Sequence, residues 1–100
     1  MSHKFTVIIQ EEVVDELEEI YSFIAQDHPK NAEKFINELK KKIGELDTFP
    51  KRGTLCPEMG DDAERRFIVY KGYSITYRIV ESEVWITHIL APGLNWRYGI

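Results

Sequence analysis

The last third of the chain alternates between apolar and polar positions in the way that β-strands do. Three runs rich in β-branched and aromatic residues, at 65–70, 73–80 and 84–90, are separated by short polar connections. Such runs predict a three-stranded antiparallel meander. Gly72 adopts a positive φ at little cost, which favours a two-residue hairpin turn at positions 71 and 72.

This turn also predicts which residues face each other across the strands. It places Ile68 opposite Ile75 and Arg65 opposite Arg78, while a three-residue turn at 81–83 would place Val80 opposite Val84, Arg78 opposite Ile86 and Thr76 opposite His88. Side chains alternate between the two faces of a strand. The face expected to cover the core carries Ile68, Tyr70, Tyr73, Ile75, Tyr77, Ile79, Trp85 and Ile89. The opposite face carries Arg65, Phe67, Val69, Thr76, Arg78, Ile86 and His88.

The first half of the chain changes from a strand pattern to a helical one. Residues 5–9 are an apolar-rich run that predicts a first strand. Apolar residues then recur at intervals of three and four, which predicts one amphipathic helix from Glu11 to about Gln26 and a second from Pro29 to about Asp47. Residues 51–64 show little periodicity and are expected to form a loop. The predicted core combines these stripes with the sheet: Leu17, Ile20, Ile24, Phe35, Leu39, Ile43, Ile75 and Tyr77.

These elements predict an α+β fold in one domain that spans residues 1–100. An N-terminal strand precedes an antiparallel helical hairpin, and the hairpin packs on one face of an antiparallel β-sheet. The apolar stripes of the two helices require a partner, and the apolar face of the sheet supplies one.

Charge and cysteine content narrow the possible functions. The net charge of −4 argues against a dedicated nucleic-acid binder, because phosphate contacts require clustered Lys and Arg. A single cysteine can form neither an internal disulfide nor a metal site by itself. We expect the protein to bind no metal and no cofactor. No apolar run reaches the length of a signal peptide or a membrane span, so we expect a cytoplasmic protein with no membrane contact.

Arg65, Arg78 and His88 are the candidate catalytic residues. A metal-free ribonuclease needs a base for the 2′-hydroxyl, cations for the phosphorane charge and an acid for the leaving oxygen. These three side chains on one sheet face, with Glu58 or Glu64 nearby, could compose such a site. The alternative is that the arginines pair with neighbouring carboxylates or bind a partner protein, and that His88 is a hydrogen-bonded structural residue.

The order of elements and several local motifs resemble the RelE/ParE superfamily of bacterial toxins. The motifs are Ile-Tyr-Ser-Phe-Ile-Ala at 20–25, His-Pro at 28–29, Phe-Pro-x-x-Gly at 49–53, Pro-Glu-Met-Gly at 57–60 and Tyr-x-Ile-x-Tyr-Arg-Ile at 73–79. The resemblance covers nearly the whole chain. The Pro-Glu-x-Gly element and the Tyr-x-Ile-x-Tyr-Arg strand make the chain look more like the ParE branch than the RelE branch.

The resemblance implies the toxin component of a type II toxin–antitoxin, or plasmid stabilisation, system. A ParE-like toxin would bind a target such as DNA gyrase and would be neutralised by a cognate antitoxin. A RelE-like toxin would instead cleave ribosome-bound mRNA without a metal, and a third possibility is a toxin fold without toxicity. ParE-like chains commonly follow the last strand with a His-Gly-Ala-Arg type of segment, whereas residues 90–95 here contain neither His nor Arg. RelE-like nucleases usually place Lys, Arg and Tyr after that strand, where Arg97 and Tyr98 are the only candidates in this chain. We therefore expect binding rather than catalysis, with an oligomer as a further possibility.

Overall fold

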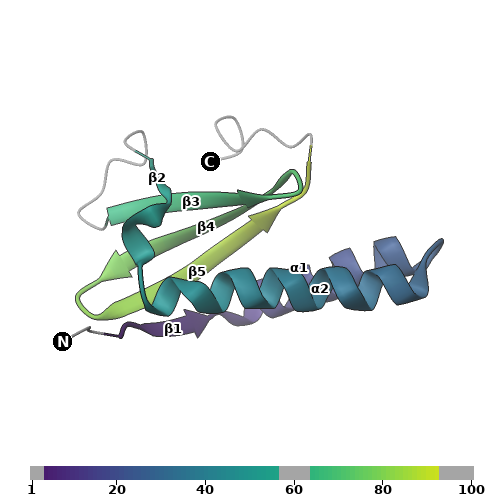
Figure 1. Cartoon of the computed structure of the whole chain (residues 1–100), viewed down its shortest axis with the longest axis horizontal. Helices are drawn as coiled ribbons and strands as arrows, with labels where there is room; N and C mark the ends of the chain where they lie inside the picture. Colours follow the sequence, from purple (N-terminus) through teal and green to yellow (C-terminus); the bar gives the residue numbers. More distant parts are fainter. Residues whose placement is uncertain (1–3, 57–63, 93–100) are drawn as a thin grey trace.

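The computed structural model describes residues 4–56 and 64–92 and contains two helices beside one sheet. The chain forms β1 (Thr6–Ile9), α1 (Glu11–Ala25) and α2 (Pro29–Gly44), followed by short 3₁₀ turns η1 (Glu45–Asp47) and η2 (Pro50–Arg52). The strands β2 (Thr54–Leu55), β3 (Glu64–Tyr70), β4 (Tyr73–Val80) and β5 (Glu83–Leu90) complete the described part. The predicted α+β fold is confirmed, and Figure 1 shows the helices along one side of the sheet.

The sheet is mixed rather than antiparallel throughout. Its five strands run in the order β1-β5-β4-β3-β2, and β1 lies parallel to β5 while the other pairs are antiparallel. Apolar alternation predicts that a strand exists but does not encode its direction relative to a distant neighbour. The strand β2, inside the segment predicted as loop, has only two residues and is too short to show a period.

The predicted register is confirmed between β3 and β4 and is wrong between β4 and β5. Arg65 lies opposite Arg78 and Ile68 opposite Ile75, around the turn at Lys71 and Gly72, whose φ angles are both positive. The second turn has two residues rather than three, so Val80 pairs with Glu83 instead of Val84. Arg78 consequently lies opposite Trp85 and not opposite Ile86.

A β-bulge at Thr87 restores the predicted pairing further along β5. Tyr77 lies opposite Ile86, and the next residue of β4, Thr76, lies opposite His88, so Thr87 is the extra residue. Its hydroxyl donates to the Thr76 carbonyl oxygen at 3.1 Å and lies 2.9 Å from the Thr76 hydroxyl. The bulge lets Ile86 and Ile89 both point into the core, where they are 0% and 5% exposed. The prediction that placed Ile86 outside and Trp85 inside is therefore wrong.

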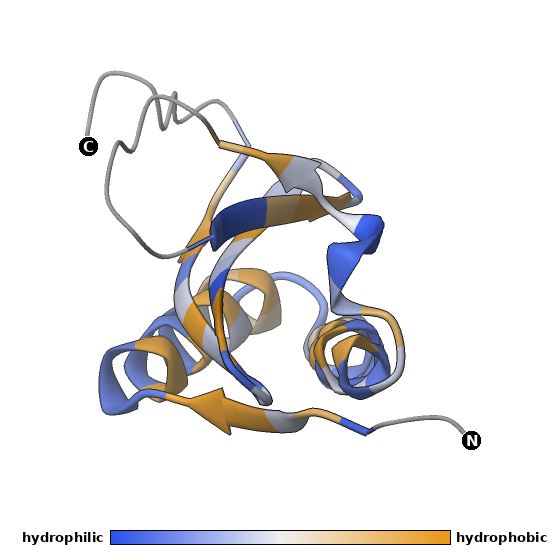
Figure 2. Cartoon of the chain, turned by 90° about the vertical axis from the view of Figure 1, so that its left-hand side faces the viewer, coloured by the Kyte–Doolittle hydropathy of each residue, from blue (hydrophilic) through white to orange (hydrophobic). Residues whose placement is uncertain are grey.

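The core lies between the helices and the inner face of the sheet. Leu17, Ile20, Leu39, Ile43, Ile75 and Tyr77 are buried as predicted, while Ile24 and Phe35 are partly buried against them. Figure 2 shows hydrophobic residues along the strands and on both helices. Neither α1 nor α2, the helices in the described residues, combines the length and the hydropathy that a membrane crossing requires.

One contact ties α2 to the end of β3. The Tyr70 hydroxyl donates a hydrogen bond to Glu38 Oε1, and this bond is the main reason that the pKa of the Glu38 carboxyl is lowered. Lys71 lies 3.5 Å from the same oxygen. The Tyr70 ring also stacks on Phe35, with ring centroids 5.8 Å apart. Helix and sheet are thus joined by apolar and polar contacts at one place.

Tyr77 fastens the segment around η2 to the middle of the sheet. Its hydroxyl donates to the Pro50 carbonyl oxygen and accepts the Gly53 N–H at 3.1 Å. A Cβ at position 53 would lie only 2.3 Å from the Tyr77 hydroxyl oxygen, so this close approach requires glycine. Arg66 supports the same segment by donating to the Gly53 carbonyl oxygen at 2.7 Å.

Replacing Leu39 by alanine tests the helical stripe. Leu39 is 0% exposed, and truncating it leaves a cavity among residues that cannot fully relax. Leu39→Ala should lower the free energy of unfolding by about 2–5 kcal/mol in a denaturant titration. Val14→Ala is the control on the same hairpin, since Val14 is 44% exposed and its truncation should cost less than about 1 kcal/mol. Equal losses in the two variants would refute the assignment of the stripe.

Replacing Tyr77 by phenylalanine tests the hydrogen bonds that attach the η2 segment to the sheet. The change leaves the Gly53 N–H without its acceptor and should cost about 1–3 kcal/mol. Burial raises the pKa of Tyr77, so the folded chain keeps this proton at a pH where the unfolded chain loses it. The contribution of Tyr77 to the free energy of unfolding is therefore fully present below about pH 10. It is lost as the pH rises through the pKa that Tyr77 has in the folded chain.

The Tyr77→Phe variant should consequently lose less stability than the parent on moving above about pH 10, as measured by denaturant titration at several pH values. Tyr21→Phe is the matched control, because Tyr21 is 41% exposed. If the free energy of unfolding fell equally in Tyr77→Phe and in the parent above about pH 10, the proposed role of the Tyr77 hydroxyl would be contradicted.

Candidate functional site

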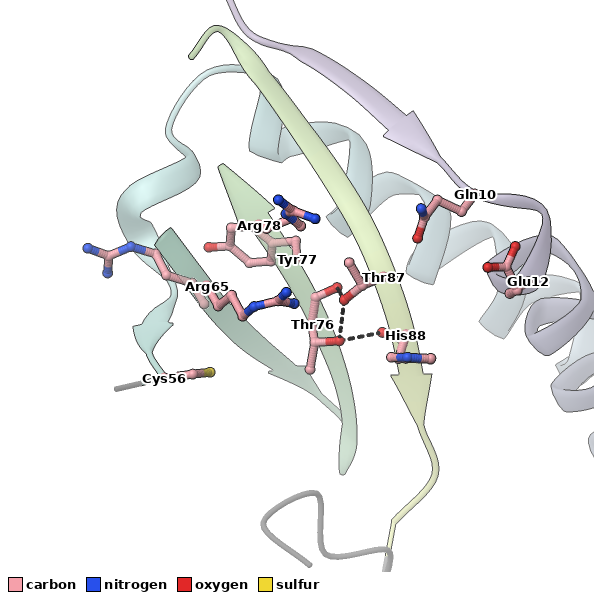
Figure 3. A pocket seen from close by; sticks show the side chains of 10 residues that line it. Gln10, Glu12, Cys56, Arg65, Thr76, Tyr77, Arg78, Thr87 and His88 are labelled. Atoms are coloured by element: carbon pink, nitrogen blue, oxygen red, sulfur yellow. Dashed lines mark hydrogen bonds between the residues drawn. The ribbon is translucent and has the colours of Figure 1, made fainter. Parts of the chain in front are cut away.

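The outer face of the sheet, opposite the helical hairpin, contains a cavity of about 280 Å³. Figure 3 shows how its lining residues converge from separate parts of the chain. Arg65 comes from β3, Thr76 and Arg78 from β4, and Thr87 and His88 from β5. The remaining lining residues are Gln10, Glu12, Cys56, Arg66 and Tyr77. The structure thus brings the three predicted site residues, Arg65, Arg78 and His88, to one cavity.

The two arginines lie directly opposite each other on neighbouring strands. Arg65 and Arg78 are partners in the β3–β4 register, and both are partly buried. Like charges in directly opposed positions repel each other. The Nε atom of Arg78 is buried and has no hydrogen-bond partner within the described residues. Arg78 Nε is therefore a buried donor that no acceptor among the described residues uses.

His88 lies at the other end of the cavity and contacts α1. Its Nδ1 atom is 3.3 Å from Glu16 Oε2, and its side chain is 53% exposed. The second oxygen of Glu16 accepts the Ile89 N–H at 2.9 Å. The pairing of β1 with β5 ends at Ile86, so Glu16 takes the place of a neighbouring strand for the part of β5 beyond it.

The carboxylates that could have assisted catalysis are placed differently from the prediction or are not described. Glu64 lies 2.5 Å from Arg66 Nε and 3.9 Å from Lys51 Nζ, so its carboxylate pairs with basic residues in and beside the η2 segment. Glu58 lies outside the described residues. Glu12 is the carboxylate that the structure brings to the cavity rim. Nothing in the sequence pattern indicated Glu12 or Gln10, because their position depends on the parallel pairing of β1 with β5.

Basic side chains outnumber acidic ones in the lining of the cavity. Three guanidinium groups and an imidazole line it beside the carboxylate of Glu12, and the guanidinium of Arg66 is bonded to Glu64 and to the Gly53 carbonyl oxygen. Thr76 and Thr87 use their hydroxyls on each other and on the strands. Within residues 4–56 and 64–92 no three His, Cys, Asp or Glu side chains gather in a way that could hold a metal ion.

A second surface feature is a groove between α1 and the end of β5. It encloses about 570 Å³ and is lined mainly by apolar groups, among them Ile20, Phe23, Tyr73 and Leu90. Phe23 is 69% exposed, which is the largest exposed fraction among the large apolar side chains of the described residues. Glu16 and Glu19 form the acidic rim of the groove. Exposed apolar surface with a polar rim marks many protein-binding sites.

A comparison with solved structures supports the fold. A chain from the chromosomal ParDE TA system from P. aeruginosa superposes with a TM-score of 0.75, covering 91% of this chain and 99% of that chain. The two sequences share 18% identity, so this similarity is one of fold. No curated protein sequence gives a significant match to the chain.

A comparison with protein families extends the similarity to the sequence. The model of the ParE toxin of type II toxin–antitoxin systems, parDE, matches residues 7–91, which include every described strand and helix except the first residue of β1. That range also contains Arg65, Arg78 and His88. A match over most of the length shows the family, and the chain therefore belongs to the ParE toxins of type II toxin–antitoxin systems.

Proposed function

We propose that this toxin acts by binding a protein target, DNA gyrase, and that a cognate antitoxin neutralises it by docking in the groove between α1 and β5. Family membership makes the chain the toxin component of a type II system. The observation that carries the proposal is the apolar groove with Phe23 exposed at its edge. Such a surface suits contact with another protein rather than chemistry on a small substrate.

The lining of the groove defines the segment that would fill it. Ile20, Phe23 and Leu90 would receive apolar anchors, and the carboxylates of Glu16 and Glu19 would face basic side chains. An amphipathic segment with apolar residues at helical spacing and Lys or Arg beside them fits this pattern. A segment of this kind can order as it binds, as many regulatory segments do.

Gyrase inhibition is the first test of the proposed action. Purified protein added to DNA gyrase and relaxed plasmid should reduce the supercoiling that gyrase introduces, and the co-encoded antitoxin should restore it. The plasmid topoisomers are separated on an agarose gel. Supercoiling that continues unchanged at a large molar excess of the toxin would remove gyrase as the target.

The groove itself is tested with one substitution and its control. Phe23→Asp places a charge where an apolar anchor would pack, and it should weaken antitoxin binding by roughly 100-fold in calorimetry, as the loss of an aromatic anchor from an interface commonly does. Phe49→Asp is the control, because Phe49 is 59% exposed and does not line the groove. Similar affinities for Phe23→Asp and the parent would place the antitoxin elsewhere.

Cleavage of ribosome-bound mRNA is the second candidate function. One observation favours it: Arg65, Arg78 and His88 line the same cavity. If the cavity performs this reaction, Arg65→Ala and Arg78→Ala should each abolish cleavage while the fold persists, because a preorganised cation in such a site is worth about 3–4 kcal/mol. The assay maps mRNA ends after incubation with translating ribosomes. We expect no cleavage by the parent protein, and new ends that vanish in Arg65→Ala would establish the nuclease instead.

A further inference from the structure

We propose that the toxin forms a symmetric dimer through the face of its helical hairpin that points away from the sheet. The occupant of this face is a second copy of the chain, whose α2 lies on α1 of the first copy and whose α1 lies on its α2. The inference goes beyond the proposed function, because this face is separate from the groove between α1 and β5 and requires neither gyrase nor the antitoxin.

The position of the face follows from the turn of a helix by about 100° per residue. On α1, Val14 directly follows the buried Val13, and Tyr21 directly follows the buried Ile20. Val14 and Tyr21 therefore lie to one side of the core stripe. Phe23, which lines the groove beside β5, lies to the other side. The flank of α1 that carries Val14 and Tyr21 consequently points away from β5.

The same reasoning places one flank of α2 away from the sheet. Glu38 directly precedes the buried Leu39, and its carboxylate accepts a hydrogen bond from Tyr70 on the sheet. Lys40 follows Leu39 and lies on the opposite flank. The two flanks that turn away from the sheet form one surface, which we call the hairpin face. Its members are exposed and each directly follows a buried residue: Val14, Glu18 and Tyr21 on α1, and Glu33, Asn37, Lys40 and Gly44 on α2.

The opposite charges of the two helices select a second copy as the partner. Helix α1 holds six carboxylates and no basic residue, while α2 holds five lysines and two glutamates. Within the part of the chain that the structure describes, no ion pair joins the two helices, and Glu16 is the one α1 carboxylate with an ionic partner. Like charges four residues apart on one helix repel each other. A copy that lays its α2 on this α1 compensates both helices at once.

The shapes of the two flanks are also complementary. Val14 and Tyr21 are 44% and 41% exposed and project from α1 on nearly the same line, since seven residues make almost two full turns. The α2 flank has a lower profile, and a Cβ built at Gly44 would meet no atom within 4 Å. The surface of α2 therefore has room for the valine and tyrosine of the second copy.

A twofold axis parallel to the helices brings the complementary flanks together twice. Figure 1 shows that α1 and α2 run antiparallel in the hairpin, so α1 of one copy also runs antiparallel to α2 of the other. In each contact Glu18 meets Lys40 of the second copy, and Val14 and Tyr21 are covered between the helices. The result is a closed arrangement of four helices with a sheet on each outer side.

Sedimentation equilibrium of the full chain, without antitoxin, measures the association. We expect a reversible equilibrium between monomer and dimer that shifts toward monomer as NaCl is added, because ion pairs near solvent are screened by salt. A chain that remains monomeric at low salt up to about 1 mM would overturn the inference.

An exchange of charges identifies the helices in contact. Glu18→Lys brings two lysines together at each contact with α2, and Lys40→Glu brings two glutamates together. Because the symmetry repeats each contact, either variant alone should weaken dimerisation by at least roughly tenfold. An equimolar mixture of the two variants restores opposite charges at both contacts and should dimerise as the parent does.

Glu81→Lys is the matched control for charge. It changes the net charge by the same amount as Glu18→Lys and lies in the turn between β4 and β5, so it should dimerise like the parent. A mixture of Glu18→Lys and Lys40→Glu that associates no better than either variant alone would overturn the dimer. An equal loss of association in Glu81→Lys and Glu18→Lys would overturn it too.

The apolar part of the hairpin face is tested with two residues of α1. Tyr21→Asp should weaken dimerisation by at least roughly tenfold, because a charge enters the contact. Phe23→Asp is the comparison on the opposite flank and should dimerise like the parent. Circular dichroism verifies that each variant stays folded. Equal losses in Tyr21→Asp and Phe23→Asp would place the contact at the groove and overturn the inference.

Discussion

The pairing of β4 with strands on both sides is the constraint on which the rest of the structure depends. This strand is held in register by β3 and β5, so its side chains must alternate between the core and the outer face. Tyr77 points inward, is 1% exposed and fastens the η2 segment. Arg78 follows it and points outward into the cavity. A slip of one residue would exchange the two, burying a guanidinium group in the core and exposing the tyrosine.

The bulge at Thr87 and the carboxylate of Glu16 adapt β5 to this constraint. Without the extra residue, Ile86 and Ile89 would fall on opposite faces and one of them would leave the core. The carboxylate of Glu16 then occupies the edge of β5 where β1 has ended. Bulges are common beside functional sites because they redirect side chains. Here Thr87 and His88 line the cavity, and the next two residues, Ile89 and Leu90, line the groove.

Much of the fold could be predicted because local rules fix it. Positive φ at Gly72 and the alternation on each side gave the β3–β4 register, and with it the juxtaposition of Arg65 and Arg78. The same alternation failed on β5, because neither the two-residue turn nor the bulge leaves a signal in the spacing of Val84, Trp85 and Ile86. The bulge places both Ile86 and Ile89 in the core, which is a property of the folded sheet and not of the local spacing. The parallel position of β1 likewise depends on the whole chain.

The candidate site could also be predicted only in part, because some of its residues share one strand pattern and others are brought in by contacts between distant segments. Arg65, Arg78 and His88 could be grouped from the sequence because they share a sheet face. Gln10 and Glu12 could not, since only the docking of β1 beside β5 brings the start of α1 to the cavity. Glu64 was a reasonable candidate by proximity in sequence, but Arg66 and Lys51 hold it on the side of the η2 segment.

The toxin is proposed to act through contacts with partner proteins, and the groove between α1 and β5 is the surface that carries this proposal. A crystal structure of the toxin with its co-encoded antitoxin tests the proposal most directly. We expect an apolar side chain of the antitoxin packed against Phe23 and Ile20 in the groove. An antitoxin that neutralises the toxin while it leaves the groove and Phe23 uncovered would contradict the proposal.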